Sequence, residues 1–485
     1  MARGQPHLEH LLRRAGFGAS PEELNAFERM SNSQVLEYLL DVNGQPDDVD
    51  ARIGDPAHIG VPLRGPDSME TNIEDARQRW LFRLLHSRRP LQEKMALFWH
   101  NHFATAYSKV AGFAGAVQAT KMMALKAGGR VPGPQGQLEL FRQRGLGRFR
   151  ELLADVARDP AMLVWLDNRT NTRQRPQENF AREVMELFTL GIGRYTEEDV
   201  YAAARVFTGW NLRLVGRGGE ASGYYEFFYN AAQHETREKT FTFAVSPGGS
   251  RTIPARSAAE GMQDGIDFLN ALARHPETAR RLAGKLWNFF VSEVHPPDPE
   301  FVNAAASIYL QRDTDVGAVV QFILGSRWFQ SPVYWYTRYA WPAEFVVRSL
   351  KEVGWNGFSA DTARSWVAAM GQTLFEPPDV NGWDTGPGWF STGAMLARMN
   401  FAAALARDQQ FNLAVDAAGA RTSPESLIGF FMERLSPPPY DREPYEGLVE
   451  YLRAGATWPA ADAQLRAKAS GLARLMVGSS EYQFI

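Results

Sequence analysis

The sequence predicts a mainly α-helical protein, with one large multi-helix body and a small β-rich insertion. Helix-type segments and helix caps recur along most of the chain. Strand-type segments are confined to residues 211–256, and no internal repeat or low-complexity tail is present. The composition, 45% hydrophobic and 22% charged, is typical of a globular protein with a sizeable core. We therefore expect residues 1–485 to form a single helical domain that carries the insertion.

The first part of the chain predicts short helices separated by loops. Ser20 and Pro21 are the cap and first residue of one helix, and Asp159 with Pro160 open another that runs to Leu166. Residues 41–65 and 127–137 are rich in glycine and proline and predict loops. The other helices expected here cover residues 7–14, 21–30, 33–40, 74–85 and 90–100, and one begins near Pro176.

The second part changes character and then returns to helix. Thr196 and Asp199 form a capping box for a helix that runs to Phe207. Residues 224–229 are rich in aromatic residues, residues 239–245 combine aromatic with β-branched residues, and both predict strands of a small hairpin or excursion. Helices are expected again over residues 258–272, 276–291, 299–310 and 314–324, followed by helices and aromatic loops.

Charge and composition exclude several classes of protein. The net charge of −3 gives no electrostatic footprint for nucleic acid or an anionic membrane. The absence of cysteine excludes disulfides, thiolate zinc sites, iron–sulfur clusters and a cysteine nucleophile. No apolar run approaches the roughly 18 residues of a transmembrane helix, and the start has no signal-peptide core. The chain as written is expected to be soluble and cytoplasmic, or periplasmic or secreted if a leader was removed.

Glu183 and Glu186 lie three residues apart on a predicted helix that is otherwise largely apolar. The apolar stripe of this helix consists of Phe180, Val184, Leu187 and Gly191, widened by Phe188 and Leu190. At about 100° per residue, Glu183 falls inside this arc and Glu186 at its border. Burying an unpaired carboxylate costs several kcal/mol, so we expect an arginine, a histidine or a metal opposite Glu183.

Histidines supply the complementary ligands. His100 and His102 would project about 200° apart on a helix but would share one face of an extended segment. His234 lies in the irregular insertion, where binding residues are common. These histidines with Glu183 predict a mixed nitrogen and oxygen site for a divalent transition metal such as Fe, Mn, Zn or Cu. Glu186 would orient the ligands or act as general base. Packed histidines are the alternative.

Two further groups could bind substrate. Asp167, Asn168 and Asn171 offer short oxygen ligands for an ion or for sugar hydroxyls, with Asp167 a candidate catalytic residue, whereas the alternative is a turn after a helix. Trp383 and Trp389 could form a platform for a sugar, or their indoles could fill a gap between helices.

Familiar catalytic motifs are absent from the sequence. No P-loop, Gly-x-Ser-x-Gly elbow, Rossmann glycine fingerprint or complete set of kinase motifs is present. We therefore expect no nucleotide cofactor. Glu183 and Glu186 could serve as a glycosidase pair by residue type, but neighbours at i,i+3 are poorly placed to straddle a sugar ring.

Long motifs along the chain resemble one known family. They are LLRRAGFG (11–18), FWHNHFAT (98–105), DPAMLVWLDN (159–168), ENFAREVMELFTLGIGRYTEEDV (178–200), ARVFTGW (204–210), MGQTLFEPPDVNGW (370–383) and ARMN (397–400). The order and length of these motifs resemble the bacterial family called domain of unknown function 1800. The resemblance implies a mostly helical, often exported bacterial protein, and supplies no reaction. Gln177 stands where the family pattern has asparagine, which weakens any role of that position as a ligand.

Three functions follow as hypotheses. The first is a metal-dependent hydrolase or oxidoreductase with a His/Glu site in a helical core, acting on an unknown small molecule or glycan. The second is a non-catalytic binding or scaffold protein of the bacterial envelope, in which Glu183 pairs with a buried arginine such as Arg182 or Arg205. The third is a carbohydrate-binding or carbohydrate-active protein built on the Trp383–Trp389 loop.

Overall fold

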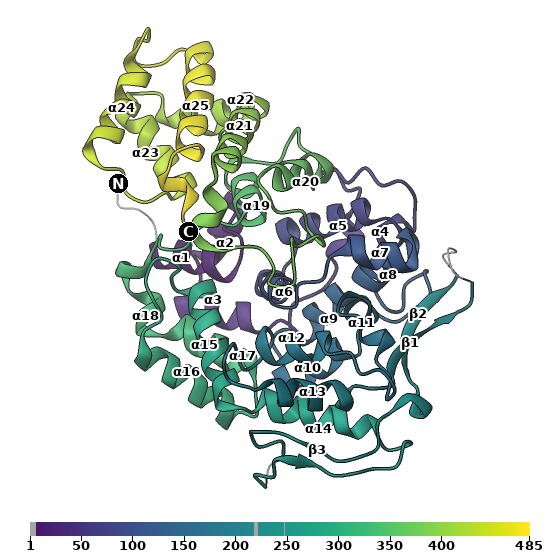
Figure 1. The fold of residues 1–485 in the computed structure, drawn as a ribbon. Helices are drawn as coiled ribbons and strands as arrows, with labels where there is room; N and C mark the ends of the chain where they lie inside the picture. The colour runs from purple at the N-terminus through teal and green to yellow at the C-terminus, as the bar shows by residue number, and fades with distance from the viewer. Residues whose placement is uncertain (1–5, 218–221, 247) are drawn as a thin grey trace.

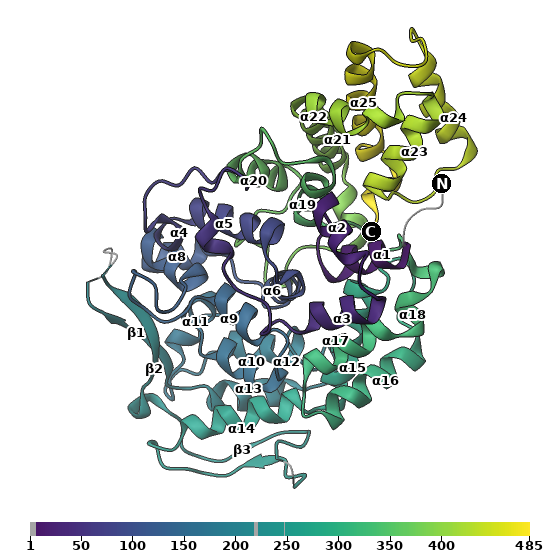
Figure 2. The ribbon, with the colours of Figure 1, turned by 180° about the vertical axis from the view of Figure 1, so that it is seen from behind.

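The computed structural model describes residues 6–217, 222–246 and 248–485. Helices dominate these residues, and their strands form two small two-stranded sheets, which confirms the predicted mainly α fold with a small β-rich insertion. Figure 1 shows a broad helical body from which the C-terminal helices project as a lobe at the upper left. The same lobe stands clear of the body in the reverse view of Figure 2.

The N-terminal helices surround α6, which lies at the centre of the body (Figure 1). All residues of α6 from Leu91 to His100 are buried, because α1, α3, α5 and α9 pack around it. The helices of this part are α1 (Pro6–Ala15), α2 (Pro21–Phe27), α3 (Asn32–Leu40), α4 (Ser68–Thr71), α5 (Ile73–His86), α6 (Pro90–His102), α7 (Tyr107–Ala114), α8 (Ala116–Ala124) and α9 (Gln137–Arg144).

The middle of the chain forms the lower half of the body in Figure 1. Helix α12 packs on α13, and α15 packs on α16. The helices of this part are α10 (Phe149–Ala157), α11 (Pro160–Trp165), α12 (Asn179–Glu186), α13 (Glu197–Val206), α14 (Met262–Ala273), α15 (Pro276–Phe290), α16 (Pro299–Gln311) and α17 (Val316–Gly325).

The insertion lies at the edge of this half and is only partly regular. Strand β1 (Trp210–Val215) pairs antiparallel with β2 (Tyr224–Tyr229), which confirms the strand predicted over residues 224–229. Of residues 239–245, only β3 (Lys239–Thr240) is strand, paired with β4 (Thr252–Ile253). The strand ends there because Thr242 donates its backbone N–H to the Asp199 carboxylate of α13.

The C-terminal helices form the projecting lobe and its connection to the body. Helix α19 is buried along its whole length and packs against α5, α20 and α23. The helices of this part are α18 (Arg327–Gln330), α19 (Pro342–Val353), α20 (Ala360–Ala369), α21 (Thr392–Asp408), α22 (Gln410–Asp416), α23 (Pro424–Leu435), α24 (Arg442–Arg453) and α25 (Asp462–Val477).

Helix ends follow the predicted caps, with one important exception. Asp159 accepts the Met162 N–H to cap α11, and Thr196 forms the predicted capping box of α13. Helix α12 was expected to reach Gly191 but ends at Glu186. Gly191 adopts a left-handed φ of 94°, so the chain turns away and the predicted apolar arc is cut short.

Buried charges join the central helices to one another. Lys94 of α6 pairs with Glu344 of α19, and Arg338 also donates to Glu344 Oε1 at 2.7 Å. All three side chains are at most 2% exposed. Because these ions are removed from water, their attraction to one another must compensate the cost of burying them.

Candidate functional site

The end of α6 shows what the predicted histidine motif does. The helix continues through His102, so His100 and His102 project apart, as the helical alternative required. His100 Nε2 accepts the Phe375 N–H at 3.0 Å. Burial, with a smaller effect of Arg77, lowers the pKa of His100 to about 3. His100 is therefore a neutral side chain that holds the start of the segment 375–390, which we call the aromatic loop.

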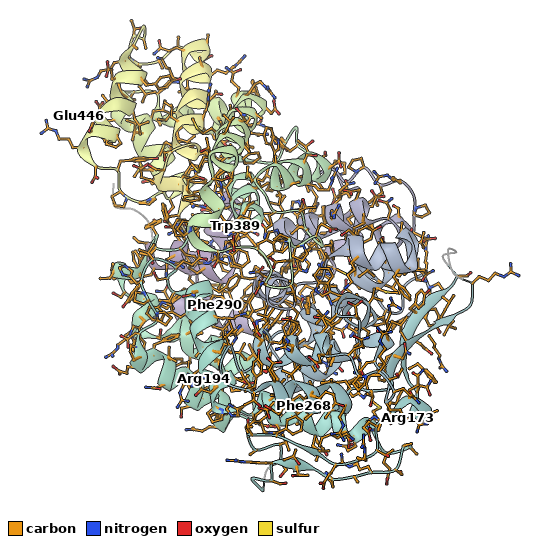
Figure 3. The ribbon with its side chains drawn as sticks, in the orientation of Figure 1. Arg173, Arg194, Phe268, Phe290, Trp389 and Glu446 are labelled. Carbon is orange, nitrogen blue, oxygen red and sulfur yellow. The ribbon has the colours of Figure 1, made fainter. Side chains whose placement is uncertain are left out.

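Asn101, between the two histidines, holds the same loop further along. Its Oδ1 accepts the Trp383 N–H at 2.7 Å. A Cβ at Gly382 would lie 2.2 Å from Asn101 Oδ1, and Gly382 has a φ of 87°, so only glycine fits there. Trp383 and Trp389 are only 6% and 4% exposed, and Figure 3 labels Trp389 near the middle of the view. The two indoles thus pack in the interior, and little of their surface is exposed for the sugar platform that the sequence allowed.

His234 anchors the insertion. Its Nδ1 lies 2.8 Å from the Thr208 carbonyl oxygen, and its Nε2 lies 3.2 Å from Asp264 Oδ2. Lys239 and Arg256 also donate to Asp264, and His234 is fully buried. This charged cluster fastens β3 to α14 and occupies both ring nitrogens of His234.

The four predicted metal ligands are not brought together. His100 faces the aromatic loop, His234 faces α14, and Glu183 lies on α12. Residues 6–217, 222–246 and 248–485 contain no group of three or more His, Asp or Glu side chains that could hold a metal ion. The expected Fe, Mn, Zn or Cu centre thus has no ligand set among these residues.

Asp167, Asn168 and Asn171 hold the chain rather than present a pocket. Asp167 forms a partly exposed ion pair with Lys109 at 2.9 Å. Asn168 donates to the Trp210 carbonyl at 3.2 Å and accepts from Asn171. Both asparagines are at most 2% exposed, so their amides are not available to a substrate.

The same network explains why position 177, where the family pattern has asparagine, can hold glutamine. Asn171 Oδ1 accepts the backbone N–H of Gln177 at 3.0 Å, and Asn171 Nδ2 donates to the Ala204 carbonyl at 2.8 Å. The contact uses the backbone of residue 177, so glutamine serves there as well as asparagine.

Glu183 is half-buried and lacks the partner that the sequence required. Its carboxylate makes no hydrogen bond or ion pair within the described part of the chain. Arg182 pairs instead with Glu197, and Arg205 donates to a backbone carbonyl. The early end of α12 explains this, because Leu187 to Leu190 no longer cover Glu183 as helical neighbours would. Burial first, and then Glu186, raise the pKa of Glu183.

A polar cluster nevertheless forms where α12 meets α15, and we call it the α12–α15 cluster. It consists of His102, Arg281 and Lys285, together with Glu186, whose charge acts on Arg281. Arg281 donates to the Leu187 carbonyl at 3.1 Å, at the end of α12, and His102 Nε2 lies 3.2 Å from the Phe188 carbonyl. One predicted ligand, His102, and the predicted base, Glu186, thus belong to one region, whereas Glu183 interacts there only with Glu186.

Lys285 has the least usual environment in this cluster. Its Nζ lies 3.0 Å from His102 Nδ1, and no carboxylate of the described residues pairs with it. Burial, together with the charge of Arg281, lowers the pKa of Lys285 to about 7. Burial and the charges of Lys285 and Arg281 hold the pKa of His102 well below its usual value. At neutral pH the pair can therefore be an amine beside a neutral imidazole.

The hydrogen bonds assign the tautomer of His102. The Phe188 carbonyl can only accept, so Nε2 carries the proton and Nδ1 is an acceptor for Lys285. The backbone oxygen thus orients the ring, and the ring orients the amine. Glu186 accepts a hydrogen bond from Tyr195, which fixes the orientation of the Glu186 carboxylate.

Sequence reasoning missed Arg281, Lys285 and Tyr195. Arg281 and Lys285 are four residues apart on α15, so they share a face and repel each other. This like-charge pair was the one local signal available. Nothing local indicates that the face turns toward α12 rather than toward water.

Comparison with known proteins places the fold in context. A sequence model of the family described as "Protein of unknown function (DUF1800)" matches residues 10–484, nearly the whole chain. Neither curated proteins nor solved structures give a significant match. No helix in the described ranges is long and apolar enough to cross a membrane.

Proposed function

We propose that this protein, which belongs to the DUF1800 family of proteins of unknown function, is an enzyme that acts on acidic carbonyl compounds through the amine of Lys285. The observation that carries the proposal is the 3.0 Å contact between Lys285 Nζ and His102 Nδ1, in the absence of a described carboxylate partner for the lysine. A lysine of lowered pKa near a second cation is a familiar nucleophile for imine formation.

The side chains around Lys285 suit each step of that reaction. Lys285 directs one N–H at His102, which leaves its lone pair free to attack a carbonyl carbon. The nitrogen then loses a proton to His102 Nδ1 while the alkoxide oxygen takes a proton from water, and a neutral carbinolamine forms. His102 then returns its proton to the hydroxyl group, which leaves as water as the C=N bond of the protonated imine forms.

Arg281 supplies a site for the acidic group of the substrate. Its Nη2 donates to the Leu187 carbonyl, whereas its Nε has no hydrogen-bond partner within the described residues. Guanidinium groups bind carboxylates with charge-assisted hydrogen bonds. A 2-oxo acid could place its carboxylate on Arg281 and its carbonyl carbon toward Lys285.

Reductive trapping tests the proposal directly. The protein is incubated at pH 7.5 with glyoxylate, pyruvate or 2-oxoglutarate and cyanoborohydride, and the adducts are mapped by mass spectrometry. We expect a stoichiometric adduct on Lys285 with at least one of these acids, lost in Lys285→Arg and kept in Lys109→Arg, which changes an exposed, ion-paired lysine. Failure of all three acids to modify Lys285 ahead of the surface lysines would contradict the proposal.

A second variant separates the role of His102 from that of Lys285. His102→Gln keeps a polar side chain but removes the ring base, so we expect trapping on Lys285 to slow by about 10²-fold, the lower end of general acid–base contributions. The melting temperature and the circular dichroism spectrum control for misfolding. An unchanged trapping rate in folded His102→Gln would show that the imidazole takes no part.

A further inference from the structure

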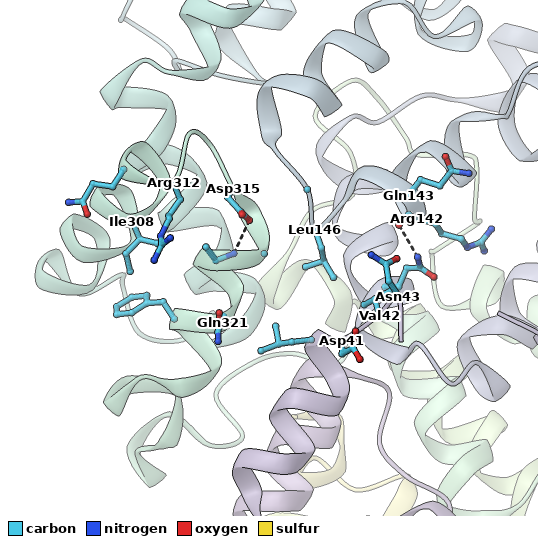
Figure 4. Close-up of a pocket in the computed structure, with 17 residues that line it drawn as sticks. Asp41, Val42, Asn43, Arg142, Gln143, Leu146, Ile308, Arg312, Asp315 and Gln321 are labelled. Carbon is cyan, nitrogen blue, oxygen red and sulfur yellow. Dashed lines mark hydrogen bonds between the residues drawn. The ribbon is translucent and has the colours of Figure 1, made fainter. Parts of the chain in front are cut away.

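A groove of about 820 Å³ opens between α9 and the pair α16 and α17, on elements outside the α12–α15 cluster. In Figure 4, Asp41, Asn43 and Gln143 lie on one side, Ile308, Arg312 and Gln321 on the other, and Leu146 between them. The volume falls within the usual range for small-molecule sites. Its two walls come from segments more than 160 residues apart in the sequence.

The lining is dominated by planar polar groups, five of which are carboxamides. These are Asn43, Gln92, Gln143, Gln311 and Gln321. Gln92 is 92% buried; it donates to the Arg142 carbonyl at 3.0 Å, and its Oε1 has no hydrogen-bond partner within the described residues. A buried unpartnered acceptor is costly and points to a missing donor.

The charges of the lining balance. Asp41 and Asp315 offset Arg142 and Arg312, so the lining carries no net formal charge. Arg142 is engaged with Glu93 and Glu139. The guanidinium of Arg312 makes no hydrogen bond or ion pair with any residue that the structure describes. The groove therefore offers both donors and acceptors to a neutral ligand.

We propose that this groove binds a neutral oligosaccharide. A sugar hydroxyl both donates and accepts, and carboxamide, guanidinium and carboxylate groups each present two polar atoms in a plane, which suits neighbouring hydroxyls on one ring. Ile308, Leu146 and Phe322 supply apolar surface for the C–H faces. An extended peptide fits less well, because the N–H groups of Val316 and Gly317 are already bonded to Gly147 and Leu146.

The test uses the full chain and an array of neutral oligosaccharides of glucose, galactose, mannose, xylose and N-acetylglucosamine, followed by calorimetry on the sugars bound. We expect the double change Arg312→Ala with Gln321→Ala to weaken binding at least roughly tenfold, as loss of two hydrogen bonds would. The matched control is Arg327→Ala with Gln330→Ala on α18, outside the groove, and it should bind normally.

A third variant addresses the buried acceptor. Gln92→Met keeps the size of the side chain and removes Oε1, so a folded Gln92→Met protein should also bind more weakly. Lys285→Arg should bind the sugar normally, so the groove and the proposed imine chemistry can fail independently. The proposal would be overturned if no sugar on the array bound, or if the groove double variant and its control bound sugar equally well. Binding of peptides from a library in the groove would also overturn it.

Discussion

At the scale of single residues, the histidines that suggested a metal centre hold backbone segments in place instead. His100 and Asn101 bond the aromatic loop, whereas His102 bonds the segment that follows α12. Both histidines are buried because α6 is enclosed. Their residue types and their helical divergence were readable from the sequence, whereas their partners were not, because Phe375 and Lys285 are 275 and 183 residues away. A histidine that bonds backbone and one that binds metal look alike without those partners.

A first prediction concerns His100. His100→Ala removes the acceptor of a buried N–H and leaves a cavity, so we expect the free energy of unfolding to fall by about 2–4 kcal/mol. Elemental analysis of the variant should match the wild type, since no metal is expected to depend on this ring. A stoichiometric metal that is present in the wild type and lost in folded His100→Ala would revive the metal-centre hypothesis.

A second prediction uses the depressed pKa of Lys285. The unfolded chain keeps this proton up to about pH 10.4, and the folded protein releases it near pH 7. Between these values the unfolded state binds more protons, so the contribution of Lys285 to folding stability rises with pH. Lys285→Met removes the buried charge, and it should therefore stabilise the protein more at pH 6 than at pH 9.

Urea unfolding at both pH values measures this difference. The control is Lys109→Met, at an exposed and ion-paired lysine, for which we expect no comparable gain at pH 6. If Lys285→Met changed the free energy of unfolding equally at pH 6 and pH 9, the pKa of the Lys285 amine would not be lowered in the folded protein.

At the scale of elements, caps were predictable and helix ends that depend on tertiary contacts were not. Asp159 and Thr196 cap α11 and α13 as predicted, because a cap needs only neighbouring residues. The end of α12 depends on Arg281 and His102, which bond the carbonyls of Leu187 and Phe188. For this reason Glu183 is only half-buried, less than its position in the predicted apolar arc implied.

A third prediction follows from the hold of α6 on the aromatic loop. Asn101→Ala removes the acceptor of the Trp383 N–H, so we expect faster hydrogen exchange in residues 376–390 than in the wild type. Asn288→Ala, at an exposed position of α15, is the control. Unchanged exchange in the loop would show that its buried tryptophans hold it without Asn101.

At the scale of the whole molecule, long-range ion pairs join parts of the chain that no local rule connects. Helix content and the insertion were predictable from composition and periodicity. The pairing of Lys94 with Glu344 across 250 residues was not, since charged residues on a helix usually predict a solvated face. The α12–α15 cluster was missed for the same reason.

A fourth prediction measures this central pair. Glu344→Gln leaves Lys94 and Arg338 buried without their shared carboxylate, so we expect a loss of about 3–5 kcal/mol in the free energy of unfolding. Glu300→Gln, which breaks an exposed pair with Arg327, should cost only about 0–1 kcal/mol. Chemical denaturation compares the two, and similar small losses would mean that the buried pair is replaceable.

The close approach of Asn101 to Gly382 has an evolutionary consequence. Any side chain at position 382 would collide with the amide that secures the following tryptophan. Lineages that replace this glycine are therefore expected to have replaced Asn101 as well, and a correlated pair of substitutions at these two positions would be the historical trace of one shared hydrogen bond.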